Sequence, residues 1–184
     1  MGYESGSQRI LNNVRKGLRL DVARAFTRDA RALGIAIHGT FILGLPGETP
    51  ATIRETIRYA CEIEPDTIQV SLAAPYPGTE LYRQAQEQGW LPQATTDLVN
   101  REGVQVAALE YPGLTSTEIF ESVEAFYRRF YFRPRKVVAM VGGMLRDRAV
   151  MRRRLREGVE FFRFLRERRA SPSQARPAAS GAHA

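Results

Sequence analysis

The chain has 184 residues, of which 43% are hydrophobic and 26% are charged, and its formal net charge is +7. These proportions are typical of a globular protein with a core of its own, and no apolar run reaches the roughly 18 residues that a membrane-spanning helix needs. The single cysteine, Cys61, excludes an internal disulfide and an all-cysteine metal site built from this chain alone. The N-terminus lacks the charged-then-apolar order of a signal peptide, so we expect a cytoplasmic protein.

The first half of the chain alternates predicted helices and strands. Asp21 can cap a helix that Gly34 ends. Apolar residues that recur at helical spacing between them are expected to face inward: Val22, Ala25, Phe26, Ala30 and Leu33. Residues 35–43 predict a strand buried on both faces, as parallel strands are. A constrained turn follows, after which Thr49 can cap a helix with Pro50 in its first position.

A second strand is predicted at residues 67–72, and a helix capped by Thr79 follows it and ends at Gly89. Strands and helices joined by short connections favour a parallel sheet or barrel. The segment at residues 2–7 reads as a loop, with no strand before it, so only two full strands are visible. Two strands are too few to close a barrel. The chain is therefore expected to be the second half of a larger domain, with a small open sheet as the alternative.

Beyond Trp90 the pattern changes. A strand is possible at residues 104–109, and Thr115 with Glu118 forms a capping box that opens a helix with a Phe- and Tyr-rich face. Further helices are expected from Pro134 to about Leu145 and over residues 148–168. These elements predict three regions: a sheet-containing part at 1–113, a helical extension at 114–169 and a disordered tail at 170–184.

Basic charge is concentrated in this extension, where residues 133–169 hold 13 basic and 4 acidic side chains. The arginines that dominate the last predicted helix are Arg152, Arg153, Arg154, Arg156 and Arg163. Such a face is either simply solvated or attracted to anionic lipid headgroups. Nucleic-acid binding is not expected, because no recognised motif supports it.

Three loops follow predicted strand positions, at residues 2–7, 44–49 and 73–79, and each contains glycine. In parallel α/β proteins, ligands gather at the carboxyl ends of the strands. One such loop alone is an ordinary turn, but three in consecutive units favour a shared site. Strand alternation also places His38 on the face of Thr40 and Ile42. There it either contacts substrate or is a hydrogen-bonded structural histidine.

The motifs in these loops resemble the second half of a radical S-adenosylmethionine (SAM) barrel. They are Gly-Tyr-Glu-Ser-Gly-Ser-Gln from residue 2, Phe-Ile-Leu-Gly-Leu-Pro-Gly-Glu-Thr from residue 41, and Pro-Tyr-Pro-Gly-Thr from residue 75. The chain is most similar to the subgroup with an N-terminal cobalamin-binding (B12-binding) domain and, within it, to proteins of hopanoid biosynthesis. This resemblance covers residues 2 to about 168. It implies an α/β fold: the C-terminal half of a TIM-like (β/α) barrel, followed by an α-helical extension.

The resemblance also implies cofactors and a site. The family uses SAM and a 4Fe-4S cluster, and the subgroup adds cobalamin. Carried over by motif, Glu4 and Ser5 reach the ribose and methionine part of SAM, Ile42 contacts the adenine, and Gly44 leaves room for the adenine ring. The backbone that would flank the adenine belongs to Ala73, Ala74 and Pro75. Thr40 departs from the family pattern, which has glycine there.

A larger departure concerns the cluster. The family holds it with three cysteines in a Cys-x-x-x-Cys-x-x-Cys loop, and this chain has only Cys61, at a core position of a predicted helix. We therefore assign no catalytic or metal-binding residue and expect a fragment of a radical SAM enzyme that is inactive alone. Its expected partner is the missing N-terminal half or a partner chain, and a hopanoid or other lipid is its expected substrate class. The alternative is a non-catalytic accessory or remnant protein. It would bind a partner through the sheet edge and the Phe/Tyr-rich helix, or bind an anionic membrane surface, peripheral to the inner membrane.

Overall fold

A computed structural model describes residues 1–91, 107–134 and 136–138. Three parallel strands, β1 (Gly2–Glu4), β2 (His38–Leu43) and β3 (Thr67–Leu72), form one sheet in the order β1-β2-β3. β2 and β3 pair in continuous register, whereas the pairing of β1 with β2 is irregular between Gly2 and Glu4. The predicted α/β class with a parallel sheet is confirmed, and the described strands form an open sheet.

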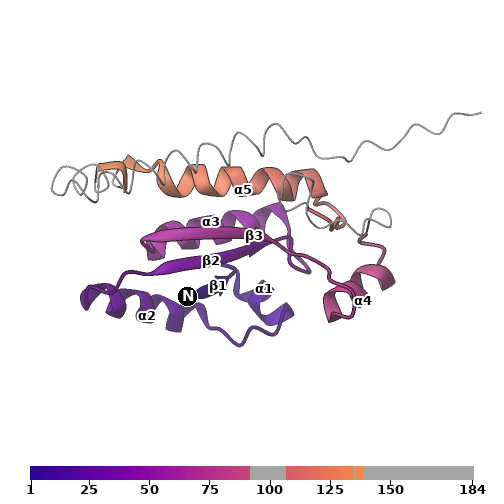
Figure 1. Ribbon diagram of the computed structural model, residues 1–184, viewed down its shortest axis with the longest axis horizontal. Helices are drawn as coiled ribbons and strands as arrows, with labels where there is room; N and C mark the ends of the chain where they lie inside the picture. Colours follow the sequence, from indigo (N-terminus) through magenta and orange to yellow (C-terminus); the bar gives the residue numbers. More distant parts are fainter. Residues whose placement is uncertain (92–106, 135, 139–184) are drawn as a thin grey trace, which may run out of the picture.

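Five helices accompany the sheet within the described residues (Figure 1): α1 (Gln8–Asn13), α2 (Leu20–Ala32), α3 (Pro50–Ile63), α4 (Glu80–Glu87) and α5 (Ser116–Tyr131). The predicted caps of the last three are confirmed. Thr49 and Thr115 each form a capping box, with Thr52 and Glu118 respectively, and Thr79 accepts the Tyr82 N–H. These caps satisfy orphan N–H groups, so the helix starts are fixed by local sequence.

Three boundaries differ from the sequence expectation. Residues 2–4 form a strand, so the reading of this segment as a loop without a strand was wrong; a three-residue strand is too short to give a periodic signal. The strand expected from residue 35 begins at His38, and Ile35 is exposed. Helix α2 begins at Leu20 after Arg19, and Asp21 lies in its first turn, where it pairs with Arg19 instead of capping the helix.

The core lies on one face of the sheet. Tyr3 of β1 stacks on Phe41 of β2 with ring centroids 5.4 Å apart, and Phe126 of α5 lies 5.2 Å from Phe41. Tyr59 of α3 meets Tyr3 edge-on, and the Tyr3 hydroxyl is hydrogen-bonded to Thr27 of α2. Helices α2, α3 and α5 therefore all pack on the same face. The aromatic side of α5 is buried in this core, and so it is not free to bind a partner as the accessory-protein alternative supposed.

Helix α2 turns a different side to the core than the one predicted. Its buried residues are small or polar, namely Ala23, Thr27 and Ala30. The Thr27 hydroxyl lies between Tyr3 and the Ala23 carbonyl, which lets the helix approach the sheet closely. Large apolar residues that were expected inside are exposed instead, with 56% of Val22, 50% of Phe26 and 77% of Leu33 accessible.

Several sequence predictions fall outside the described residues. These are most of the strand at 104–109, most of the helix from Pro134, the arginine-rich helix at 148–168 and the tail at 170–184; residues 107–109 are described and are not in a strand. The proposed boundary near residue 113 stays a prediction, although Leu109, Leu114 and α5 share one core cluster with the sheet. Over the described part of the chain, no helix combines the length and apolar character needed to span a bilayer.

Candidate ligand site at the strand tips

The three predicted loops lie at one edge of the sheet, because each follows the carboxyl end of a parallel strand. Direct contacts join neighbouring loops. The Ala73 N–H donates to the Leu43 carbonyl at 2.8 Å, and the Asn13 amide, on the α1 turn after β1, donates to the Pro46 carbonyl at 3.4 Å. The structure thus brings together residues 4–7, 44–48 and 73–75.

Glu4 ends β1 in a strained conformation. Its φ of 60° is uncommon for a residue other than glycine, and such strain is concentrated at functional sites. The carboxylate forms an ion pair with Lys16, with Nζ and Oε1 2.7 Å apart. Both charged groups lie beside Gly2, where a Cβ would come within 2.8 Å of the Glu4 carboxylate and 3.6 Å of the Thr40 hydroxyl. A carboxylate, an ammonium and a hydroxyl therefore gather above β1.

Ser5 lies on the core side of this loop. Its fully buried hydroxyl accepts the Ser7 N–H at 3.1 Å and contacts the Thr56 hydroxyl of α3 at 3.1 Å. Thr56 in turn accepts the Gly6 N–H and donates to the Thr52 carbonyl. A Cβ on Gly6 would lie 2.5 Å from Tyr59 Cβ, so only glycine allows this close approach of the loop to α3. Ser5 thus anchors the loop, and its hydroxyl does not face the open side of the sheet.

A buried carboxylate organises the second loop. Glu48 is 2% exposed, and its Oε2 accepts the N–H groups of Gly44 at 2.6 Å and Leu45 at 3.2 Å. Its Oε1 has no partner in the described structure. Burial raises the pKa of Glu48 to about 7, against the two backbone hydrogen bonds, which lower it. The Tyr111 hydroxyl donates to the Gly44 carbonyl at 2.7 Å, and burial with the nearby Glu48 charge raises the pKa of Tyr111. The Gly44 peptide is therefore held from both ends.

Gly44 has a φ of 82°, which explains why glycine occupies this turn. The space beside it is already used: a Cβ there would meet Ile119 of α5 at 3.2 Å and Ala73 at 3.8 Å. Ala73 and Pro75 are buried, and Ala74 is half-buried. These four residues form a rigid floor at the strand tips, and their role toward a ligand stays a prediction.

The face of the sheet opposite the core is polar and accessible. It carries alternate residues of β2 and β3: His38, Thr40, Ile42, Thr67, Gln69 and Ser71. His38 and Gln69 are exposed and the others are half-buried. The His38 Nδ1 lies 2.8 Å from the Thr67 hydroxyl. The hydrogen-bonded reading of His38 therefore fits the structure, and contact with substrate stays open to it because the ring is exposed.

Sequence reasoning missed Lys16 and Tyr111. Lys16 comes from the turn after α1, and no periodic signal links it to Glu4. Tyr111 lies between irregular segments, and its partner is a backbone carbonyl 67 positions away. Gln69 and Ser71, by contrast, follow from strand alternation, which puts them on the face of Thr40 and Ile42.

Neither Cys61 nor any described cluster offers a metal site. Cys61 is half-buried rather than fully inside; its thiol lies 3.7 Å from the Arg129 carbonyl, and burial raises its pKa. Within the described ranges, no three His, Cys, Asp or Glu side chains are grouped so that they could hold a metal ion.

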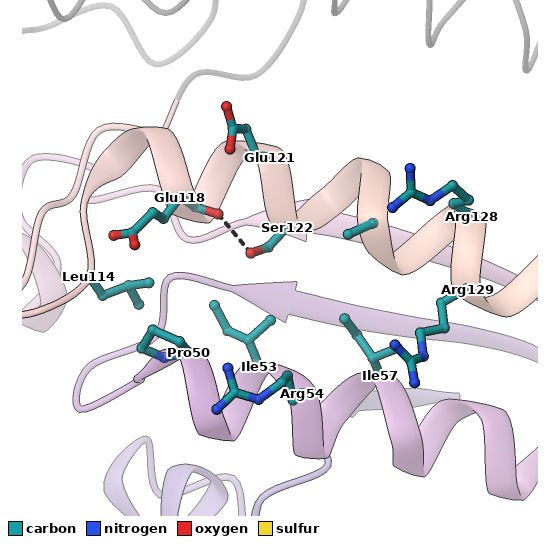
Figure 2. A pocket seen from close by; sticks show the side chains of 11 residues that line it. Pro50, Ile53, Arg54, Ile57, Leu114, Glu118, Glu121, Ser122, Arg128 and Arg129 are labelled. Atoms are coloured by element: carbon teal, nitrogen blue, oxygen red, sulfur yellow. Dashed lines mark hydrogen bonds between the residues drawn. The ribbon is translucent and has the colours of Figure 1, made fainter.

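A groove between α3 and α5, of about 560 Å³, lies on the helix side of the molecule (Figure 2). Its apolar wall residues Ile53, Ile57 and Leu114 are at most 7% exposed, because they already belong to the core. What remains accessible is mainly charged, including Arg54 and Arg129. This groove lacks the apolar lining of a typical ligand pocket, so the strand tips remain the better candidate.

Comparison with known proteins places this geometry among related sequences. The chain is 30% identical over 143 residues to an uncharacterised methyltransferase of Pyrococcus horikoshii, and 31% identical over 137 residues to the cytidylyl-2-hydroxyethylphosphonate methyltransferase of Streptomyces wedmorensis. It is 27% identical over 133 residues to the anaerobic magnesium-protoporphyrin IX monomethyl ester cyclase of Cereibacter sphaeroides. Methylthiotransferases are also among its relatives. No protein-family model matches the chain.

These matches cover 74%, 69% and 72% of this chain but only 29%, 25% and 21% of the three relatives, so the chain spans less than a third of the length of each. The relatives are methyltransferases, methylthiotransferases and a cyclase of the radical SAM family, which confirms the resemblance at the level of that family. The similarity does not extend to the hopanoid assignment.

Proposed function

We propose that this chain is part of a radical SAM enzyme and that its strand tips hold the adenosyl portion of SAM. The observation that carries the proposal is the gathering of three rigid loops at one edge of a parallel sheet, beside a polar face that described helices leave uncovered. Relatives from the same family support it. Ligands of open parallel sheets bind outside the carboxyl ends of the strands.

Each side chain is assigned a role by its chemistry. Ile42 is half-buried on the open face and offers an apolar contact to the flat adenine ring. Glu4 and Lys16, paired at 2.7 Å, can exchange their mutual contact for the ribose hydroxyls and the charged methionine part. The backbone of residues 73–75 would flank the adenine edge. Ser5 and Gly44 act behind this layer, because their local space is filled by Thr56 and Ile119.

The 4Fe-4S cluster does not fit the residues of this chain. A site of three thiolates needs three cysteines, and Cys61 is the only one. It lies on α3 beside the Arg129 carbonyl, among core-facing residues. In this proposal, cluster ligands come from outside these 184 residues, and we derive no reaction step through the cluster. Cobalamin likewise enters only as a property of the subgroup.

The proposed reaction class is methyl transfer. Two of the relatives with the broadest coverage of this chain are methyltransferases, although their own substrates differ from one another in name. A hopanoid or other lipid substrate, and attachment to an anionic membrane, remain predictions from the sequence resemblance and the basic segment at 133–169. We favour the enzyme fragment over the accessory protein because the loops of the open face are held rigidly by Thr56, Glu48 and Tyr111.

The test is saturation-transfer NMR on the chain with SAM at about 1 mM, a concentration suited to weak binding. We expect transfer to the adenine protons, and we expect Ile42→Asp to abolish it. Val22→Asp, which changes an exposed apolar residue far from the strand tips, is the matched control and should leave transfer intact. Absence of transfer, or equal transfer with Ile42→Asp, would overturn the proposal in favour of a non-catalytic accessory protein.

A further inference from the structure

The outer flank of α2 carries large apolar side chains with no cover among the described residues. Val22, Phe26 and Leu33 are 56%, 50% and 77% exposed, and Ile35 just beyond the helix is 56% exposed. Scattered surface apolar residues are ordinary, but four of this size on one helix and its exit mark an interaction surface. We call Val22, Phe26, Leu33 and Ile35 the α2 flank.

Helical geometry gives the direction of this flank. At about 100° per residue, Val22, Phe26 and Leu33 fall within about 40° of one another around the helix. The residues that meet α3 are Arg24, which pairs with Glu62 at 2.6 Å, and Arg31, which donates to the Ile63 and Glu64 carbonyls. They lie about 170° away from the centre of the flank, and the core-facing residues of α2 lie between. The α2 flank therefore faces directly away from α3.

The strand beneath α2 is also unpartnered on that side. β1 is an edge strand, and among the described residues only β2 pairs with it. Exposed strand edges invite pairing with another chain segment. An apolar helix flank and an open strand edge thus lie on the same side of the molecule, next to one another in chain order.

We infer that this side binds a strand–helix unit from outside these 184 residues. Its strand would pair with the free edge of β1, and its helix would lay an apolar side against the α2 flank, in the way that α3 lies against the other side of α2. The charge pattern fits an uncharged contact. Arg28 and Asp29, which lie beside the flank, pair with each other at 2.9 Å and so leave no net charge for the partner to neutralise. The fact that the chain spans less than a third of its relatives supplies a source for such a unit.

This inference deepens the proposed function by naming a partner, and it is tested separately from SAM binding. The probe is the part of the Pyrococcus horikoshii methyltransferase that lies outside the matched region, co-expressed as a separate polypeptide with the complete 184-residue chain. We expect the two to co-purify, and Phe26→Glu to weaken the association about tenfold or more, because charge in a buried apolar contact is costly. Arg58→Glu, an exposed change on α3, is the matched control and should have little effect.

Hydrogen exchange gives a second measurement. In the complex, amides of β1 and α2 should exchange more slowly than in the chain alone, while those on the outer side of α3 stay unchanged. Failure to co-purify, or equal loss with Phe26→Glu and Arg58→Glu, overturns the inference, as does self-association of the chain through the α2 flank in the presence of the probe. Ile42→Asp should leave co-purification intact, so a failed SAM site and a failed docking surface give different results.

Discussion

The two faces of the sheet differ in what their side chains are committed to. On the core face, Tyr3 and Phe41 are fully buried and each contacts more than one aromatic ring. On the other face, His38 and Gln69 are exposed, and Thr40 and Ile42 are half-buried. Parallel sheets are normally covered on both faces. The difference teaches that stability and recognition are separated in this molecule, one on each side of the same strands.

The sharpest test of this separation uses two neighbours on β2. Phe41→Ala removes a ring packed between Tyr3 and Phe126 and should lower the free energy of unfolding by about 3–5 kcal/mol. Ile42→Ala, one residue along but on the open face, should cost about 1 kcal/mol because less apolar surface is lost. Urea unfolding followed by circular dichroism measures both. Equal losses at the two positions would mean that both faces belong to one core.

The second prediction concerns Glu48, at the edge where the two faces meet. Burial raises its pKa to about 7 from an ordinary 4.5, so the folded state holds the proton more tightly than the unfolded state. Stability from this group is therefore complete below about pH 4.5 and is lost as the pH rises to about 7, by up to about 3 kcal/mol. Unfolding free energies measured from pH 4.5 to 8 should show this decrease.

Glu48→Gln should flatten that pH dependence, since an amide does not titrate. Glu121→Gln provides the control: this carboxylate is exposed on α5, so its variant should follow the wild-type curve. A wild-type curve that is level between pH 5 and 7 would show that Glu48 ionises freely, and that the unpartnered Oε1 is reached by solvent.

Sequence alone predicted much of this arrangement where the signal is local. The caps at Thr49, Thr79 and Thr115 were placed correctly because capping depends on residues within one turn. Parallel pairing of the strands at 38–43 and 67–72 followed from short connections. β1 was missed, because three residues of strand depend on pairing with distant Thr40 and Phe41 for their conformation.

The error on α2 has a different cause. Helical spacing identified two adjoining stripes, and the more apolar one was taken as the core side. The structure instead turns Ala23, Thr27 and Ala30 inward, because small residues and the hydrogen bond from Tyr3 to Thr27 permit close packing. Similarly, motif reasoning brought Glu4, Gly44 and Ala73 to one edge correctly. It could not foresee that Ile119, from a helix 75 positions after Gly44, fills the space beside that glycine.

The third prediction tests how firmly the floor of the site is held. Tyr111→Phe removes the only hydrogen bond that a described side chain donates to the Gly44 carbonyl, and that carbonyl lies in a buried position. The expected loss is about 1–2 kcal/mol of unfolding free energy. Tyr76→Phe, which changes an exposed tyrosine in the third loop, should cost nearly nothing. If the two variants are equally stable, the Gly44 turn does not depend on Tyr111.

The smallest effect is expected on the open face itself. Lys16→Met breaks the ion pair with Glu4, whose side chains are 37% and 18% exposed, and should change the unfolding free energy by less than about 1 kcal/mol. Arg19→Met, which breaks the more exposed pair with Asp21, should have a similarly small effect. The two variants should differ in saturation transfer from SAM, which Lys16→Met weakens and Arg19→Met leaves unchanged. A loss of several kcal/mol with Lys16→Met would instead make the Glu4 pair part of the structural framework, because groups reserved for a ligand contribute little to folding.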